Sequence, residues 1–238
     1  IDHGESNLGG NYKILSKNRM PAGISFDLTY KGERTHVTLP GVVGKSHAYA
    51  TLAGTASALS LNLSLSQAVK GFESHEPPAG RTRLIPGVRR SVIIDDSYNA
   101  SPAAAEEALE ALQGAPRTGK RIAVLADMLE LGSFSVSEHK RIGSVAAKSA
   151  DVLITVGVRA KGIAEAALAS GMPSENVRSF DEGIGVASHL NSEIGEGDVV
   201  LVKGSQSMRM ERVVKALMAH PEDAEKLLVR HDPEWLLR

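Results

Sequence analysis

The chain has 238 residues, 27 of them basic and 28 acidic, and its formal charge of -1 at pH 7 disfavours a nucleic-acid or anionic-membrane surface. It contains no cysteine, which excludes a disulfide framework and a cysteine-ligated metal site. No apolar run approaches the roughly 20 residues that span a bilayer, and no signal-peptide pattern is present. The chain starts Ile1-Asp2-His3, so we expect it to begin inside a longer protein.

The first third of the chain predicts a hairpin and two helices. Residues 1–21 are polar and glycine-rich and predict no regular element. Alternating apolar residues over 23–40, interrupted at Lys31-Gly32-Glu33, predict a β-hairpin. Residues 47–61 predict a buried helix, and residues 65–74 predict a second helix that starts near Ser64 or Ser66. Residues 76–80 then predict a linker.

From residue 91 onward, short apolar runs alternate with amphipathic helical patterns. The predicted strands cover residues 91–95, 121–126, 152–156, 177–180 and 199–202. The predicted helices cover residues 103–113, 137–149, 160–170, 184–194 and 208–219, with a short terminal helix after residue 221. This alternation predicts an α/β fold with a mostly parallel sheet and helices on both faces.

The first of these strands ends in a polar sequence, Asp95-Asp96-Ser97-Tyr98-Asn99, before Ser101 and Pro102 open a helix. Ligands of open α/β sheets bind at the carboxyl ends of the strands, so this sequence is a candidate binding site. The alternative is that these carboxylates and the amide only satisfy turn and cap hydrogen bonds.

Gly44-Lys45-Ser46 precedes a predicted helix and superficially suggests a phosphate-binding loop. Such a loop needs a glycine five residues before Gly44, where this chain has Leu39. The sequence therefore predicts a strand–loop–helix corner, with Ser46 as the N-cap of the helix.

Four motifs, in this order, resemble those of the Mur ligases. They are Gly80-Arg-Thr-Arg-Leu84, Asp95-Asp-Ser-Tyr-Asn-Ala-Ser-Pro102, Leu125-Ala-Asp-Met-Leu-Glu-Leu-Gly132 and Val202-Lys-Gly-Ser-Gln-Ser-Met-Arg-Met-Glu211. The resemblance implies that residues 80–238 form a Rossmann-like C-terminal domain. It also implies that residues 1–79 are the end of the central α/β ATP-binding domain, with the P-loop and magnesium ligands upstream of this chain.

The motifs look most like those of the members that add D-alanyl-D-alanine to a UDP-N-acetylmuramoyl-tripeptide during peptidoglycan synthesis. The resemblance implies an ATP- and Mg²⁺-dependent amide ligase that works through an acyl phosphate. It also implies a cytoplasmic monomer without a nucleic-acid partner. With the P-loop absent, we expect this chain to hold no catalytic residue or metal ligand and to be inactive alone.

Five residues match positions that contact ATP in the family. Arg81 would reach the phosphates, Asp96 would bind the ribose hydroxyls, and Tyr98 and Asn99 would line the adenine and ribose. His47 stands where the family has one of two adenine-contacting asparagines, and it could replace that amide as a donor. The alternatives are a solvated linker arginine and a structural histidine.

The resemblance also implies two loops that hold the dipeptide. The loop after the second predicted strand would face the amine, and the loop after the last strand would hold the carboxylate at a helix N-terminus beside Lys203. The alternatives are an acidic cap in the first loop and a helix capped by Ser207 in the second. The candidate residues are Asp127, Met128, Glu130, Lys203, Ser205, Ser207 and Arg209.

Two other functions stay open from the sequence. The sheet pattern also suits a non-catalytic Rossmann-like module that binds a nucleotide or a protein partner, because fold does not fix function. A sister Mur ligase is the other alternative, although those ligases carry a histidine in place of the Tyr98-Asn99 pair.

Overall fold

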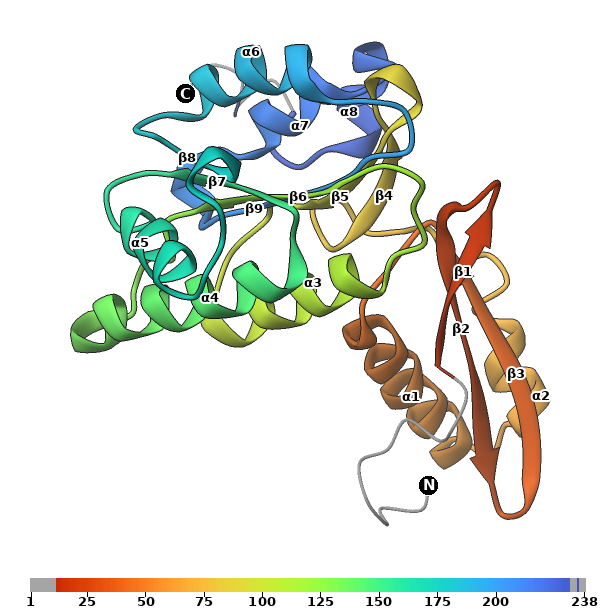
Figure 1. The fold of residues 1–238 in the computed structure, drawn as a ribbon. Coiled ribbons are helices and arrows are strands. Elements are labelled where there is room, and N and C mark those ends of the chain that lie inside the picture. Colours follow the sequence, from red (N-terminus) through yellow and green to blue (C-terminus); the bar gives the residue numbers. More distant parts are fainter. Residues whose placement is uncertain (1–11, 232–234, 236–238) are drawn as a thin grey trace.

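The computed structural model describes residues 12–231 and residue 235, and these residues form two separate β-sheets. Figure 1 shows a three-stranded sheet with two helices lying beside a six-stranded sheet that has helices above and below it. The mostly parallel α/β fold predicted from the sequence is confirmed.

The smaller sheet has the antiparallel order β1-β2-β3, with β1 at Lys13–Lys17, β2 at Met20–Tyr30 and β3 at Glu33–Pro40. Strands β2 and β3 form the predicted hairpin, and Lys31 and Gly32 make its turn with positive φ angles of 48° and 84°. Strand β1 was not predicted, because its sequence does not alternate and its hydrogen bonds come from pairing with β2.

Two helices cover one face of this sheet. They are α1 (Lys45–Ser60) and α2 (Leu65–Lys70), and Ala48 of α1 packs in the same core as Phe26 and Val37. Of the two serines proposed as the start of the second helix, Ser64 is its N-cap and forms a capping box with Gln67.

The larger sheet has the order β4-β5-β9-β6-β7-β8. Neighbouring strands are parallel except β4, which runs antiparallel to β5 at one edge and was not predicted. Strands β6, β7 and β8 have the predicted bounds. The strands are β4 (Arg83–Pro86), β5 (Val92–Asp96), β6 (Arg121–Ala126), β7 (Val152–Val156), β8 (Val177–Phe180) and β9 (Val199–Lys203).

Helices cover both faces of this sheet (Figure 1). One face carries α3 (Pro102–Gly114), α4 (Ser135–Ser149) and α5 (Lys161–Ala169). The other carries α6 (Gly183–Glu193), α7 (Glu211–Leu217) and α8 (Ala224–Leu227). Single 3₁₀ turns lie at Val88–Arg90, Gly132–Phe134, Ser174–Asn176, Gln206–Met208 and Pro221–Asp223.

The strand order brings three polar loops together. Strand β9 lies between β5 and β6, so its last residue, Lys203, pairs with Asp96 on one side and Leu125 on the other. The loops after these three strands therefore share one stretch of the carboxyl edge. Over residues 12–231 and 235, the structure contains no helix that is long and apolar enough to cross a membrane.

Candidate functional site

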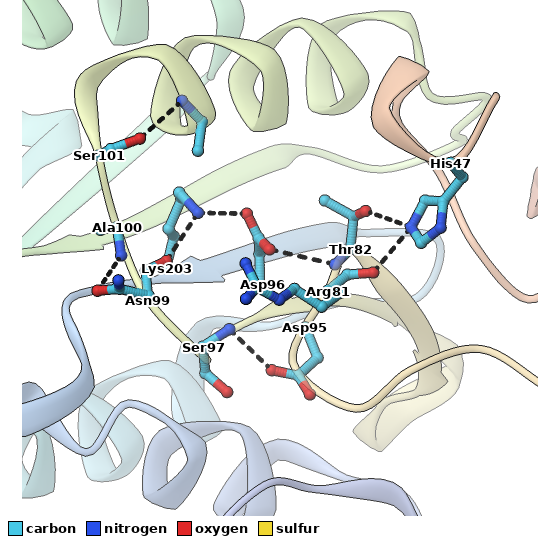
Figure 2. Close-up of polar contacts among 11 residues, drawn as sticks. His47, Arg81, Thr82, Asp95, Asp96, Ser97, Asn99, Ala100, Ser101 and Lys203 are labelled. Carbon is cyan, nitrogen blue, oxygen red and sulfur yellow. Dashed lines mark hydrogen bonds and ion pairs between the residues drawn. The ribbon is translucent and has the colours of Figure 1, made fainter. Parts of the chain in front are cut away.

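Asp96 and Lys203 form a buried ion pair at the carboxyl edge of the sheet (Figure 2). The Nζ of Lys203 lies 2.5 Å from Oδ2 of Asp96 and donates a second hydrogen bond to the carbonyl oxygen of Asn99, at 2.9 Å. The Oδ1 of Asp96 accepts from the backbone N–H of Thr82 at 3.2 Å. Lys203 was predicted to bind the dipeptide, but its contacts join it to Asp96 and Asn99, which were predicted to bind ATP.

Asp95, the residue before this pair, is completely buried and ties the predicted linker to β5. Its carboxylate accepts from the backbone N–H groups of Gly80, at 3.1 Å, and Ser97, at 3.2 Å. Burial raises the pKa of Asp95 to about 6, although these two hydrogen bonds act in the opposite direction. Asp95 is therefore the structural carboxylate of the Asp-Asp pair.

Arg81 and Tyr98 are stacked at the exposed side of this cluster. The guanidinium carbon of Arg81 lies 4.1 Å from the centroid of the Tyr98 ring, and 40% of Tyr98 is accessible to solvent. A planar cation and a phenol ring at the rim can meet a ligand that carries phosphate and an aromatic base. Asn99 is also exposed, and its Oδ1 accepts from the N–H of Ala100 at 2.9 Å.

His47 on α1 contacts Arg81 and Thr82, the residues just before β4. Its Nε2 is 2.9 Å from the carbonyl oxygen of Arg81 and 2.9 Å from Oγ1 of Thr82 (Figure 2). Burial lowers the pKa of His47, which favours a neutral ring. These contacts are those of a histidine that holds the backbone before β4, and the predicted contact with adenine stays a prediction.

The loop after β6 has a buried and an exposed part. Asp127 is 4% exposed, and its Oδ1 accepts from the N–H of Ala160 at 2.7 Å, which fixes the start of α5. Met128 is 2% exposed and packs in the core between the sheet and α3, α4 and α5. Glu130 is exposed, with a φ of 64°. Of the three predicted residues in this loop, Glu130 therefore has the side chain that faces solvent.

Two hydrogen bonds of Ser205 join the loop after β9 to the loop after β6. Ser205 donates its N–H to the carbonyl oxygen of Asp127 at 3.1 Å, and its Oγ accepts from the N–H of Leu129 at 2.8 Å. The two loops predicted to hold the dipeptide are therefore in direct contact. Ser207 is exposed, and Nε of Arg209 lies 2.5 Å from Oε1 of Glu211.

The prediction that a helix starts at residue 208 in this loop is wrong. Residues 206–208 form a 3₁₀ turn, Arg209 is left-handed with a φ of 52°, and α7 begins at Glu211 with no side-chain cap. Ser207 is therefore not an N-cap. The N–H groups of Ser205, Met208 and Arg209 already donate to carbonyl oxygens, because the loop closes on itself and on Asp127.

The Gly44-Lys45-Ser46 corner is also capped differently from the prediction. Helix α1 begins at Lys45, its N-cap is Gly44, and Ser46 makes no side-chain cap hydrogen bond. Instead, Oε1 of Glu107 on α3 accepts from the N–H of Ser46 at 2.6 Å. A carboxylate from another helix thus accepts from one of the unpaired N–H groups at the start of α1. Ser46 is the second residue of the helix and is not at the N-cap position.

Four residues complete the site without being among the predicted ligand contacts: Thr82, Asp95, Glu211 and Arg230. The first three lie inside the recognised motifs, and Asp95 has the alternative role considered from the sequence, because its carboxylate accepts hydrogen bonds from backbone N–H groups. Glu211 and Arg230 form a buried ion pair behind Tyr98, with Nη1 of Arg230 3.1 Å from Oε2 of Glu211. Arg230 has no signal in the sequence, because only the fold brings it to this loop.

The sequence profile described as "Mur ligase, glutamate ligase domain" matches residues 80–206. The chain is 29% identical to the UDP-N-acetylmuramoyl-tripeptide--D-alanyl-D-alanine ligase of Bacillus subtilis, over 82% of this chain and 44% of that protein. It is 31% identical to the ligase of the same name from Escherichia coli, over 82% of this chain and 42% of that protein. The chain thus spans less than half the length of these relatives.

Two solved structures have a similar fold. One is the MurF ligase of Thermotoga maritima in complex with ADP, with a TM-score of 0.73 and 23% identity over 91% of this chain and 46% of that one. The other is MurF from Acinetobacter baumannii, with a TM-score of 0.68 and 27% identity over 87% of this chain and 45% of that one.

Proposed function

The chain belongs to the Mur ligase family, and we propose that it is the nucleotide- and amine-binding part of an ATP-dependent ligase that adds D-alanyl-D-alanine to a UDP-N-acetylmuramoyl-tripeptide. Relatives named for that reaction are 29% and 31% identical to this chain. The observation that carries the proposal is the convergence of Asp96, Arg81 and Tyr98 at one edge of the sheet. We also propose that residues 1–79 complete the central domain and residues 80–238 form the C-terminal domain.

The residues predicted to bind ATP offer contacts for each part of a nucleotide. When bound, ATP would supply the phosphoryl group that activates the carboxylate of the tripeptide. Asp96 keeps lone pairs that can accept from ribose hydroxyls, because each carboxylate oxygen accepts more than one hydrogen bond. Tyr98 and Asn99 border the place for the base and ribose, and the exposed Arg81 can neutralise phosphate charge.

We assign Lys203 to the nucleotide side of the site. Its ammonium contacts Asp96 and the carbonyl oxygen of Asn99, and it is 3% exposed, so it can fix Asp96 for the ribose. The dipeptide would then meet the joined loops after β6 and β9. Glu130 and Ser207 are their exposed candidates for the amine and carboxylate, and Asp127, Met128, Ser205 and Arg209 shape the loops.

Mg²⁺ is not assigned to a residue of this chain. Over residues 12–231 and 235, the structure has no group of three His, Asp or Glu side chains that could hold a metal ion. The family resemblance puts the magnesium ligands upstream of this sequence, and on that ground we propose that other parts of the complete ligase bind the Mg²⁺ that accompanies ATP.

Steady-state kinetics of the natural full-length protein test this assignment. Asp96→Ala should raise the KM for ATP by about tenfold or more, because a charged hydrogen bond contributes roughly 1.5–3 kcal/mol. Lys203→Met should raise the same KM and leave the KM for D-alanyl-D-alanine nearly unchanged. Asp181→Ala, at an 81% exposed side chain, is the control. ATP binding without any dipeptide joining would favour the non-catalytic module instead.

A further inference from the structure

Arg230 is a buried arginine whose guanidinium contacts the backbone of the loop after β5. It is 7% exposed and lies in the segment that follows α8. Its Nη2 donates to the carbonyl oxygen of Tyr98 at 2.6 Å, and its Nη1 lies 3.4 Å from the carbonyl oxygen of Ser97. One guanidinium therefore contacts two successive peptide groups of the loop that carries the nucleotide-binding candidates.

Glu211 holds this guanidinium in place. Its Oε2 lies 3.1 Å from Nη1 of Arg230, and its other oxygen, Oε1, accepts from Nε of Arg209. The side chains of Arg230 and Glu211 are only 4% and 1% exposed. Removing two charges from water is costly, and apolar pairs of similar size are often at least as stable, so stability alone is a weak reason for this pair.

The geometry connects this pair to the exposed stack. The guanidinium carbon of Arg230 lies 5.6 Å from the centroid of the Tyr98 ring, and that of Arg81 lies 4.1 Å from the same centroid. A planar fork that holds the peptide groups of Ser97 and Tyr98 fixes the direction in which the phenol leaves the backbone. The contacts thus run from α7 through Arg230 and Tyr98 to Arg81.

We propose that Arg230, oriented by Glu211, is a positioning residue that presets Tyr98 and Arg81 for the nucleotide. This inference rests on the proposed function, because it gives a role at the same site. Preorganisation lowers the cost of binding, because the ligand then has fewer side chains to order. With two such side chains, loss of Arg230 should weaken nucleotide binding by roughly tenfold.

The alternative is that Arg230 only neutralises Glu211 and stabilises the fold. The double variant Arg230→Met/Glu211→Met separates the two roles. It removes both charges of this pair and keeps apolar volume, and the arginine that also loses its contact with Glu211, Arg209, has a side chain that is 17% exposed to solvent. Arg230→Lys is the second variant, because lysine can pair with Glu211 but lacks the planar fork that donates to two carbonyl oxygens. Arg212→Met, at an exposed arginine of α7, is the matched control.

The test measures ADP affinity by titration calorimetry and the two KM values in the natural full-length protein. Both Arg230 variants should bind ADP roughly tenfold more weakly and raise the KM for ATP, with the KM for D-alanyl-D-alanine unchanged and the Arg212 control like wild type. Wild-type ADP affinity in a folded Arg230 variant would overturn this inference alone. A wild-type protein that binds no ADP would overturn the proposed function, and this inference with it.

Discussion

At the scale of single residues, the site depends on charges that are buried in pairs. The side chains of Asp96 and Lys203 are 9% and 3% exposed, and each is the other's charged partner at the end of two neighbouring strands. A buried charge that loses its partner is costly, so these two residues should be strongly coupled. Arg81 and Tyr98 at the rim are more exposed and should contribute to ligand binding rather than to stability.

We predict that Asp96→Ala lowers the free energy of unfolding by about 3–5 kcal/mol, because the Lys203 ammonium is left buried and unpaired. Adding Lys203→Met should recover part of this loss, with a coupling energy of about 1–3 kcal/mol. Urea unfolding of the two single variants and the double variant measures this coupling.

Lys45 and Glu110 provide the matched control for this double-mutant cycle. They form an ion pair at 2.9 Å, but their side chains are 47% and 51% exposed. Solvent screens such a pair, so its coupling energy should be about 0–1 kcal/mol. Equal coupling in the two pairs would contradict the view that burial makes the Asp96–Lys203 pair important.

Asp95 should make stability depend on pH in the opposite direction from an ordinary paired carboxylate. Its pKa is about 6 in the folded chain and 3.8 as the reference value, so the folded state binds the proton more tightly. The Asp95 contribution is therefore complete below about pH 4 and is lost as the pH rises towards 6 and above.

Asp95→Asn should remove this loss, because an amide does not ionise. The free energy of unfolding of the variant relative to wild type should rise by about 1–3 kcal/mol between pH 4 and pH 7. Denaturant unfolding at several pH values measures the difference, with Asp181→Asn as the exposed control. A difference that stays constant over this range would show that Asp95 is already ionised at pH 4.

At the scale of elements, helices α4 and α5 are in unusually close contact at Gly143. A Cβ added there would lie 2.2 Å from the carbonyl oxygen of Ile163 and 2.8 Å from Cβ of Ala166. Gly162 on α5 offers the matched comparison, because its added Cβ would meet its nearest neighbour, the Cβ of His139, at 3.7 Å.

We predict that Gly143→Ala destabilises the chain by about 1–3 kcal/mol, since the clash is with backbone that cannot move freely. Gly162→Ala should be neutral or stabilise by up to about 1 kcal/mol, because alanine favours the helix. Thermal unfolding of both variants checks the pair. Similar melting temperatures for the two variants would mean that α4 and α5 can separate without cost.

Elements that carry their own pattern were predictable from sequence. Strands β6, β7 and β8 are short apolar runs between helices, and their bounds agree with the prediction. Strands β1 and β4 were missed because their pairing depends on partners in the sheet. The start of α7 was misplaced because tertiary hydrogen bonds between Ser205 and the loop residues Asp127 and Leu129 hold the preceding loop in another conformation.

The residues of the site were predictable as a set, but their arrangement was not. The motifs indicated Asp96 and Lys203 separately, and they adjoin only because β9 inserts between β5 and β6. The local periodicity of a sequence does not predict which strands are neighbours in the sheet. Arg230 was missed for the same reason, since more than a hundred residues separate it from Tyr98 in the sequence.

At the scale of the whole molecule, the chain joins a small antiparallel sheet to a larger parallel one. The segment after β3 hydrogen-bonds to the residues around β4, with the N–H of Val43 3.0 Å from the carbonyl oxygen of Thr82. This junction also contains His47 and Arg81, so the candidate site lies where the two parts meet. Residues 1–11 fall outside the described part of the chain.

We predict that the 238 residues alone do not join D-alanyl-D-alanine to the tripeptide. The phosphate loop expected from the family does not map onto this sequence, and loss of such charge stabilisation costs roughly two to three orders of magnitude for a single donor. Phosphate release by this chain should equal that of a blank without protein. Dipeptide-dependent release above the blank would contradict this expectation.

The most direct measurement of the central claim is phosphate release by the natural full-length protein with ATP, UDP-N-acetylmuramoyl-tripeptide and D-alanyl-D-alanine. We predict release that requires all three compounds, falls to background when the dipeptide is omitted, and needs about tenfold more ATP in the Asp96→Ala variant. Release that is independent of the dipeptide, or no release from a folded protein that binds ADP, would contradict it.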